Sequence, residues 1–175
     1  MKNDAPEERA TCAPPVLVSA CLAGLRTRYD GAATPCDEVV ALLARGRAIP
    51  FCPELHGGLG VPRRPCEIRD GHVVTDEGLN VTPAFVLGAE EGLRLARMAG
   101  CTEAILKSRS PSCGCGEIHD GTFSRTLIPG NGVFAELLLE SGIAVRTELD
   151  LSAGGGEDGD DGRERKSAEG KPGED

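Results

Sequence analysis

The sequence predicts an α/β fold with three layers: a mostly parallel, four-stranded, Rossmann-like sheet between helices, with a small β-hairpin inserted. Short apolar, β-branched runs alternate along the chain with stretches of helical periodicity. This alternation implies parallel strands joined by helical crossovers. A second observation is an Asp-Gly pair between two short β-type runs, which predicts a hairpin over residues 67–74. The length of 175 residues and the hydrophobic content of 39% suit one domain with a real core.

The apolar runs predict four strands, at residues 16–20, 48–51, 104–106 and 143–145. Thr34 and Pro35 are expected to open the first helix, with Thr34 as its N-cap and Pro35 at its first position. Thr82 and Pro83 repeat this signal before a long amphipathic stretch that a glycine ends. A third, shorter helix is expected over residues 133–138.

The two ends of the chain differ in composition from the middle. Residues 1–14 mix charges and prolines without periodicity, and residues 151–175 are dominated by glycine and charged side chains. Both segments are therefore expected to be disordered, which leaves residues 15–150 as the folded domain. The net charge of -9 lies partly in these ends, but the domain is still acidic. An acidic domain repels phosphate backbones, so a nucleic-acid partner is not expected.

The sequence also indicates a compartment. Its N-terminal residues lack the basic start of a signal peptide, and the uncharged stretch over residues 12–25 contains two prolines and is too short to span a bilayer. We therefore expect a cytoplasmic protein with no membrane partner. Because thiols stay reduced in the cytoplasm, eight cysteines indicate metal binding or catalysis rather than disulfides.

Three of the cysteines occupy equivalent positions. Cys21, Cys52 and Cys113 each follow an apolar strand and precede a glycine-rich turn. Because the carboxyl ends of parallel strands meet at one edge of a sheet, the three thiols are expected to converge there. Cys66 and Cys115 stay open as additional ligands. The remaining cysteines are expected to have no role at the site: Cys12, Cys36 and Cys101.

Three converging thiolates suit a zinc ion or an iron–sulfur cluster. A structural zinc site usually has paired C-x-x-C turns, which this sequence lacks, and single ligands from separate strand ends favour a cluster. Three cysteines on a four-iron cluster would leave one iron open as a Lewis acid for a substrate atom. Two other interpretations stay open. One is a non-catalytic zinc or iron–sulfur module with a fourth ligand, and the other is a metal-free thiol enzyme with Cys113 as nucleophile and Cys115 as resolving thiol.

Several ordered blocks of the sequence also match a known family. They are V-S-A-C-L-A-G at 18–24, R-Y-D-G at 28–31, C-P-E at 52–54, G-G-L at 57–59, P-R-x-P at 62–65, S-P-S-C-G at 110–114 and D-G-T-F at 120–123. Together they resemble the DUF523 family, which includes the thiouracil desulfurases. The resemblance covers residues 15–149, most of the expected domain.

The resemblance implies a [4Fe-4S] cluster held by Cys21, Cys52 and Cys113. It also implies a non-redox desulfurase whose substrate is a small thiolated pyrimidine, converted as 2-thiouracil is to uracil, with the sulfur captured by the open iron. Glu54 and Ser110 would then be the acid/base pair beside the substrate.

Four further residues are candidates for substrate binding because they stand in or next to the same loops: Asp30, Arg63, Lys107 and Ser112. Two positions depart from the family's pattern. His56 stands where a non-ionisable residue is usual, and Cys115 adds a thiol that could replace Cys113 or occupy the open iron. The sequence leaves the physiological substrate and the oligomeric state open.

Overall fold

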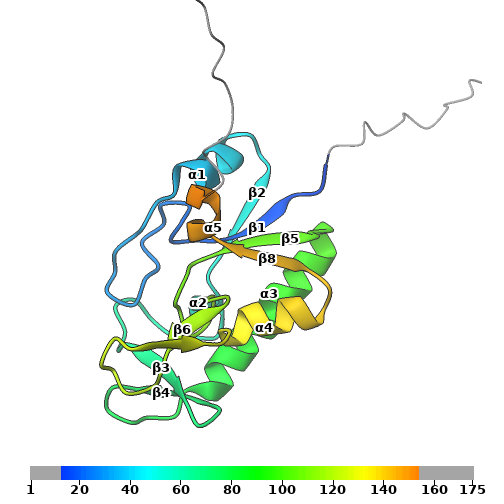
Figure 1. Ribbon diagram of the computed structural model, residues 1–175. Helices are drawn as coiled ribbons and strands as arrows, with labels where there is room; N and C mark the ends of the chain where they lie inside the picture. Colours follow the sequence, from blue (N-terminus) through cyan, green and yellow to red (C-terminus); the bar gives the residue numbers. More distant parts are fainter. Residues whose placement is uncertain (1–12, 154–175) are drawn as a thin grey trace, which may run out of the picture.

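The computed structural model describes residues 13–153 and contains the predicted four-stranded parallel sheet (Figure 1). Its strands are β1 (Val16–Ser19), β2 (Ala48–Phe51), β5 (Glu103–Leu106) and β8 (Ala144–Thr147). They lie in the order β2-β1-β5-β8, and every pair is parallel. All four strands lie at the apolar, β-branched runs from which they were predicted, so the predicted sheet is confirmed.

Helices cover both faces of the sheet, so the three predicted layers are confirmed (Figure 1). One face carries α1 (Asp37–Ala44) and α5 (Glu148–Ala153), and the other carries α3 (Thr82–Ala99) and α4 (Val133–Glu140). Because side chains alternate across a strand, β1 contributes to two cores. Val18 belongs to the core that contains Val39 of α1, and Leu17 belongs to the core that contains Phe134 of α4.

Two antiparallel hairpins and a short helix complete the fold. The predicted hairpin is confirmed as β3 (Cys66–Arg69) and β4 (His72–Thr75). Its turn residues, Asp70 and Gly71, have φ of 50° and 76°, as a two-residue hairpin turn requires. The sequence did not predict the second hairpin, β6 (Glu117–His119) with β7 (Leu127–Pro129), or the one-turn helix α2 (Pro53–His56).

The predicted start of the first helix was wrong by two residues. Asp37 is the first residue of α1 and Cys36 is its N-cap. Thr34 stands before this N-cap, and its Oγ1 instead accepts a hydrogen bond from Arg28 Nη1 at 3.0 Å. Its backbone N–H donates to Cys21 O, which keeps this segment extended. Similarly, Thr82 is the first residue of α3 rather than its N-cap, and its Oγ1 accepts from the backbone N–H of Val73.

The ends of the described chain bear on the expected domain boundaries. Helix α5 continues to Ala153, three residues beyond the expected boundary at 150. Its first turn is tied down because Asp150 Oδ2 accepts hydrogen bonds from the backbone N–H and the hydroxyl of Thr147. Residues 1–12 and 154–175, which hold most of the two segments expected to be disordered, lie outside the described residues. Among the described residues, no helix is long and apolar enough to cross a membrane.

Candidate metal centre and active site

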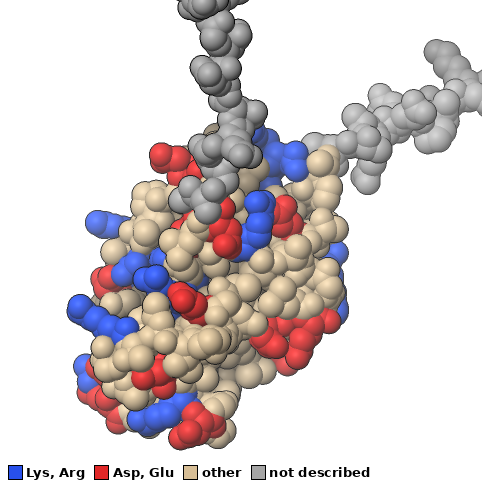
Figure 2. Space-filling view, viewed as in Figure 1, with Lys and Arg blue, Asp and Glu red and all other residues tan. Residues whose placement is uncertain are grey.

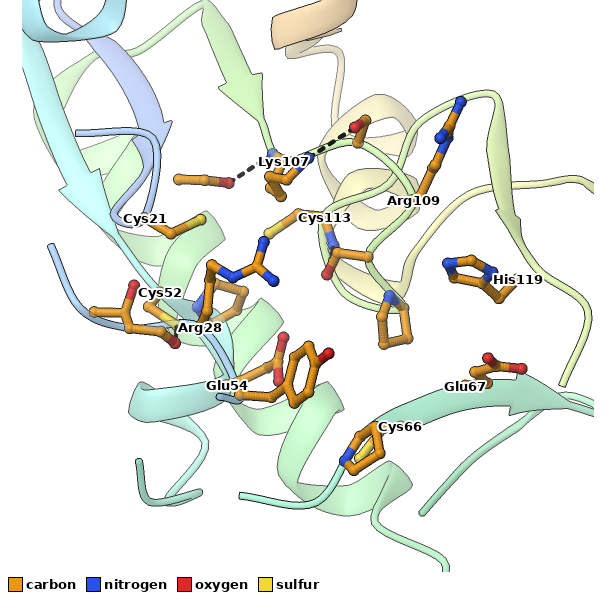
Figure 3. Close-up of a pocket in the computed structure, with 18 of the residues that line it drawn as sticks. Cys21, Arg28, Cys52, Glu54, Cys66, Glu67, Lys107, Arg109, Cys113 and His119 are labelled. Atoms are coloured by element: carbon orange, nitrogen blue, oxygen red, sulfur yellow. Dashed lines mark hydrogen bonds between the residues drawn. The ribbon is translucent and has the colours of Figure 1, made fainter. Parts of the chain in front are cut away.

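A cavity of about 780 Å³ opens where the strands of the sheet end and the hairpins begin. Cys21, Cys52 and Cys113 all line it (Figure 3). Cys52 directly follows β2, Cys21 lies in the turn after β1, and Cys113 lies in the loop after β5, so all three stand on the carboxyl side of parallel strands. Basic and acidic side chains line it as well, and both kinds are interspersed on the face of the molecule shown in Figure 2.

The loop that carries Cys113 is held by its own backbone and by α4. Ser110 Oγ accepts hydrogen bonds from the backbone N–H groups of Ser112 and Cys113, at 3.1 and 3.2 Å. The carbonyl of Ser112 in turn accepts from the N–H of Phe134, in the first turn of α4. The backbones approach so closely that a Cβ on Gly132 would lie 2.5 Å from Ser112. The position of the thiol therefore depends on the docking of this loop against α4.

All three thiols are buried, and burial changes their acidity. Burial raises the pKa of Cys21 to about 11, and the neighbouring Cys52 adds to this rise while Lys107 opposes it. Burial also raises the pKa of Cys52 and, further still, that of Cys113. A hydrogen bond from Ser19 acts against the rise at Cys113, and the nearby Cys21 and Cys52 add to it. Without a metal these thiols are protonated near pH 7, so a metal that binds them must displace their protons.

Glu54 lies at the same cavity, two residues after Cys52. Its Oε2 accepts a hydrogen bond from Arg63 Nε at 2.7 Å, and the two side chains are only 13% and 9% exposed. Arg63 also donates to the carbonyls of Thr27 and Gly60, at 3.2 and 3.3 Å. Arg63 was predicted to bind substrate. The structure places it against Glu54, where it fixes the orientation of that carboxylate.

The predicted serines have different surroundings. Ser110 lines the cavity while its oxygen accepts from two backbone groups, so its hydroxyl hydrogen is what it can offer to a ligand. Ser112 is fully buried behind the loop and does not line the cavity. Asp30 does not line it either: its carboxylate accepts from Arg28 Nε and Nη2, at 3.2 and 3.0 Å. Neither Ser112 nor Asp30 is therefore placed to contact a ligand in the cavity.

Lys107 lines the cavity and pairs with a residue that the sequence analysis missed. Its Nζ forms an ion pair with Glu148 Oε1 and donates to Ser108 Oγ. Glu148 also accepts from the N–H and the hydroxyl of Ser108, at 2.8 and 2.7 Å. Although burial works against ionisation, the hydrogen bonds from Lys107 and Ser108 lower the pKa of Glu148. Glu148 directly follows β8, so the strand-end argument that found the cysteines could have found this carboxylate.

The two departures from the family pattern do not place new groups in the cavity. His56 stacks on Phe51 with ring centroids 4.1 Å apart, and its Nδ1 lies 2.8 Å from the carbonyl of Cys52. Cys115 packs against the core beside α4 and does not line the cavity. Cys66 does line it, and burial raises its pKa to about 11. Cys36 and Cys101, for which no role at the site was expected, do not line the cavity. Cys12 lies outside the described residues.

The residues present fit an iron–sulfur cluster better than a single ion. Within residues 13–153, no three His, Cys, Asp or Glu side chains are grouped closely enough to hold one metal ion. Three buried thiols instead line one cavity that is far larger than a single ion needs. Thiolates around such a volume are the donor set of an iron–sulfur cluster, in which each cysteine binds a different iron.

A parallel α/β protein with three cysteines at the carboxyl edge of its sheet is a candidate cluster-binding enzyme. The chain belongs to the 2-thiouracil desulfurase family, whose model matches residues 16–150. An uncharacterized protein of Bacillus subtilis (strain 168), YbbK, is 39% identical over 147 residues, which cover 78% of this chain and 97% of that one.

A solved structure is also similar. The [4Fe-4S]-dependent thiouracil desulfidase TudS, described as a DUF523 protein, is 44% identical and superimposes with a TM-score of 0.77. The match covers 81% of this chain and 95% of TudS. The predicted resemblance to DUF523 is thus confirmed, and the fold agrees with that of a cluster-dependent enzyme.

Proposed function

We propose that this protein is a [4Fe-4S]-dependent desulfidase that replaces the sulfur of a thiolated pyrimidine of the thiouracil type with oxygen. The overall reaction consumes one water and releases sulfide and the oxo-pyrimidine, with no net oxidation. The observation that carries this proposal is the convergence of Cys21, Cys52 and Cys113 on one cavity together with Glu54. The family match and the likeness to TudS support it.

Cys21, Cys52 and Cys113 would hold the cluster as its three ligands. When bound, such a cluster offers one iron without a protein ligand, a soft Lewis acid that can bind a thiocarbonyl sulfur and polarise its carbon. The described cysteines are all free thiols, which supports a reducing, cytoplasmic location for the protein.

Glu54 is the group best placed to activate water. Its Oε2 is occupied by Arg63, so Oε1 would accept the proton of the water that attacks the thiocarbonyl carbon. The ion pair with Arg63 holds the carboxylate in a fixed orientation at the cavity. Ser110, whose hydroxyl faces the same cavity, would donate a hydrogen bond to the substrate ring or pass the proton on.

Two kinds of variant test the proposal on anaerobically prepared protein. Cys113→Ser should lose bound iron and sulfide release from 2-thiouracil, whereas Cys115→Ser, a matched change outside the cavity, should keep both.

Glu54→Gln should keep its iron but lose about 10²–10⁴-fold in kcat, the usual contribution of a general base. The exposed Glu77 gives the matched control, Glu77→Gln. Full turnover by Glu54→Gln would remove Glu54 from the mechanism, and full iron content in Cys113→Ser would refute the ligand set.

A further inference from the structure

Arg28 is a cationic residue of the cavity that the reaction described above does not use. Arg28 lines the cavity (Figure 3), yet its counter-ion, Asp30, does not. In Figure 3 the Arg28 side chain reaches into the cavity between Glu54 on one side and Cys21 and Cys113 on the other. Arg63 and Lys107 differ in this respect, because they bond to carboxylates that themselves line the cavity. Arg109 and Arg125 line the cavity too, but both are exposed, and Arg109 pairs with the exposed Glu117.

Arg28 is held rigidly from outside the cavity. Its Nε and Nη2 donate to the two oxygens of Asp30, and its Nη1 donates to Thr34 Oγ1 at 3.0 Å. Asp30 is itself fixed by the backbone N–H of Ala32. Thr34 is fixed by its own N–H, which donates to the carbonyl of Cys21 at 3.0 Å. The guanidinium is thereby positioned relative to one of the proposed cluster ligands.

This arrangement leaves donors for a ligand. A guanidinium has five N–H groups and no acceptor, and the bonds to Asp30 and Thr34 engage three of the five. An arginine held by groups outside a cavity presents its remaining N–H groups to an acceptor oxygen inside it. A thiolated pyrimidine has such an oxygen, because it carries a carbonyl in addition to its thiocarbonyl.

We propose that Arg28, held by Asp30 and Thr34, binds the carbonyl oxygen of the substrate and thereby selects heterocycles that carry an oxygen besides the reacting sulfur. This inference rests on the proposed function and adds to it the residue that sets substrate specificity. It makes Asp30 and Thr34 positioning residues, which act through Arg28. It also explains why Asp30, predicted to bind substrate, lies outside the cavity.

The test compares two substrates that differ at the oxygen. 2-Thiouracil carries the carbonyl, and pyrimidine-2-thione lacks it. Arg28→Gln should lower kcat/KM for 2-thiouracil about 10–100-fold, mostly through KM, since a hydrogen bond from a charged donor is lost. Turnover of pyrimidine-2-thione should not change. Arg26→Gln removes the same charge from an exposed position on the same loop and should leave both substrates unaffected.

A binding measurement gives a readout that does not depend on turnover. Uracil retains the carbonyl oxygen and has no sulfur, so calorimetric titration of the loaded protein should show its affinity reduced by the same factor in Arg28→Gln. Arg28→Lys keeps the positive charge but loses the planar guanidinium with its paired N–H donors. This variant should also lose the preference for 2-thiouracil over pyrimidine-2-thione. Iron content is measured on every variant to establish that the cluster is present.

The outcomes separate this inference from the proposed function. If Arg28→Gln and Arg28→Lys slow both substrates equally, or leave uracil binding at the wild-type value, Arg28 does not bind the oxygen and the inference is overturned. If the wild-type protein releases sulfide from neither substrate, the proposed function fails. In that case uracil binding to wild type and to Arg28→Gln still decides the role of Arg28.

Discussion

Glu54 and Arg63 are nine residues apart in the sequence and meet in an ion pair that is almost closed to solvent. Arg63 has further bonds to two backbone carbonyls, from the segments around Thr27 and Gly60. A guanidinium with this many protein partners has little left for a substrate. Its effect on the reaction is therefore expected to pass through Glu54.

A double-mutant cycle tests this dependence. Arg63→Gln should lower kcat by about 10²-fold, because a carboxylate displaced by about 1 Å loses its alignment with the attacking water. Added to Glu54→Gln, the same change should lower kcat little further, since the two residues act as one unit. Arg64→Gln, at an exposed neighbour paired with Asp76, is the control. Additive effects, or a rise in KM that persists in the double variant, would show instead that Arg63 binds substrate.

At this scale the sequence predicted the residues in the segments that follow parallel strands. Cys21, Cys52 and Cys113 could be located because position after a parallel strand determines which edge of the sheet a residue reaches. Which side chains form hydrogen bonds and ion pairs with one another could not be predicted in the same way. That Asp30 bonds to Arg28, and Arg63 to Glu54, depends on loop conformations without a periodic signal.

Among the elements, α2 and α3 approach each other closely, and this contact positions the site. α2 begins directly after Cys52 and contains Glu54. Gly88 of α3 lies against it so closely that a Cβ there would be 1.8 Å from the carbonyl oxygen of Pro53. The reciprocal approach, from Gly57 to the carbonyl of Ala84, is equally tight. Two glycines therefore allow a one-turn helix to rest directly on a long one.

Gly88→Ala should separate these two helices. The added methyl group must displace α2, an overpacking that costs about 1–3 kcal/mol and outweighs the gain of about 1 kcal/mol in helix propensity from glycine to alanine. We expect a lower melting temperature together with reduced iron content, because Cys52 moves with α2. Leu87→Ala changes an exposed neighbour on α3 and should keep its iron. If Gly88→Ala melts and binds iron as wild type does, the contact does not hold the site in place.

The elements with an apolar pattern were predictable, and the others were not. α3 is long enough for helical periodicity to be recognised, and the four-residue strands of the sheet are recognisable as apolar, β-branched runs. A helical period cannot be recognised in the four residues of α2, and β6 and β7 have only three residues each. The second hairpin, β6 with β7, is thus too short for a strand pattern to be recognised in the sequence. Its pairing is a tertiary feature, since β6 also contacts β3 of the first hairpin.

For the molecule as a whole, the cavity is where the sheet, both hairpins and the chain segment after β8 come together. Lys107 stands at the end of β5 and Glu148 at the start of α5, so their ion pair joins the middle of the sequence to its last described helix. The side chain of Glu148 is 14% exposed, so water screens this interaction only weakly. The stability of the entire domain should therefore depend on the charge of this one carboxylate.

The dependence on pH follows from the sign of the shift. Hydrogen bonds from Lys107 and Ser108 lower the pKa of Glu148 below its ordinary value of 4.5. A carboxylate with a lowered pKa in the folded state adds stability above the unfolded pKa and loses it as the pH falls through the folded one. At pH 7, Glu148→Gln should thus cost about 1.5–3 kcal/mol, the value of hydrogen bonds to a charged group, or roughly 3–12 °C in Tm.

Melting curves of wild type and Glu148→Gln between pH 3 and pH 8 measure this contribution as a difference. The gap in Tm should be constant above pH 5 and should narrow below about pH 4.5 as the wild-type carboxyl becomes protonated and comes to resemble the amide. Loss of the cluster in acid would affect both proteins and cancel in the difference. Glu140→Gln, at an exposed position on α4, should melt as wild type does at pH 7. A gap that stays constant down to pH 3 would mean that Glu148 contributes through its shape rather than its charge, and that the ion pair with Lys107 does not stabilise the fold.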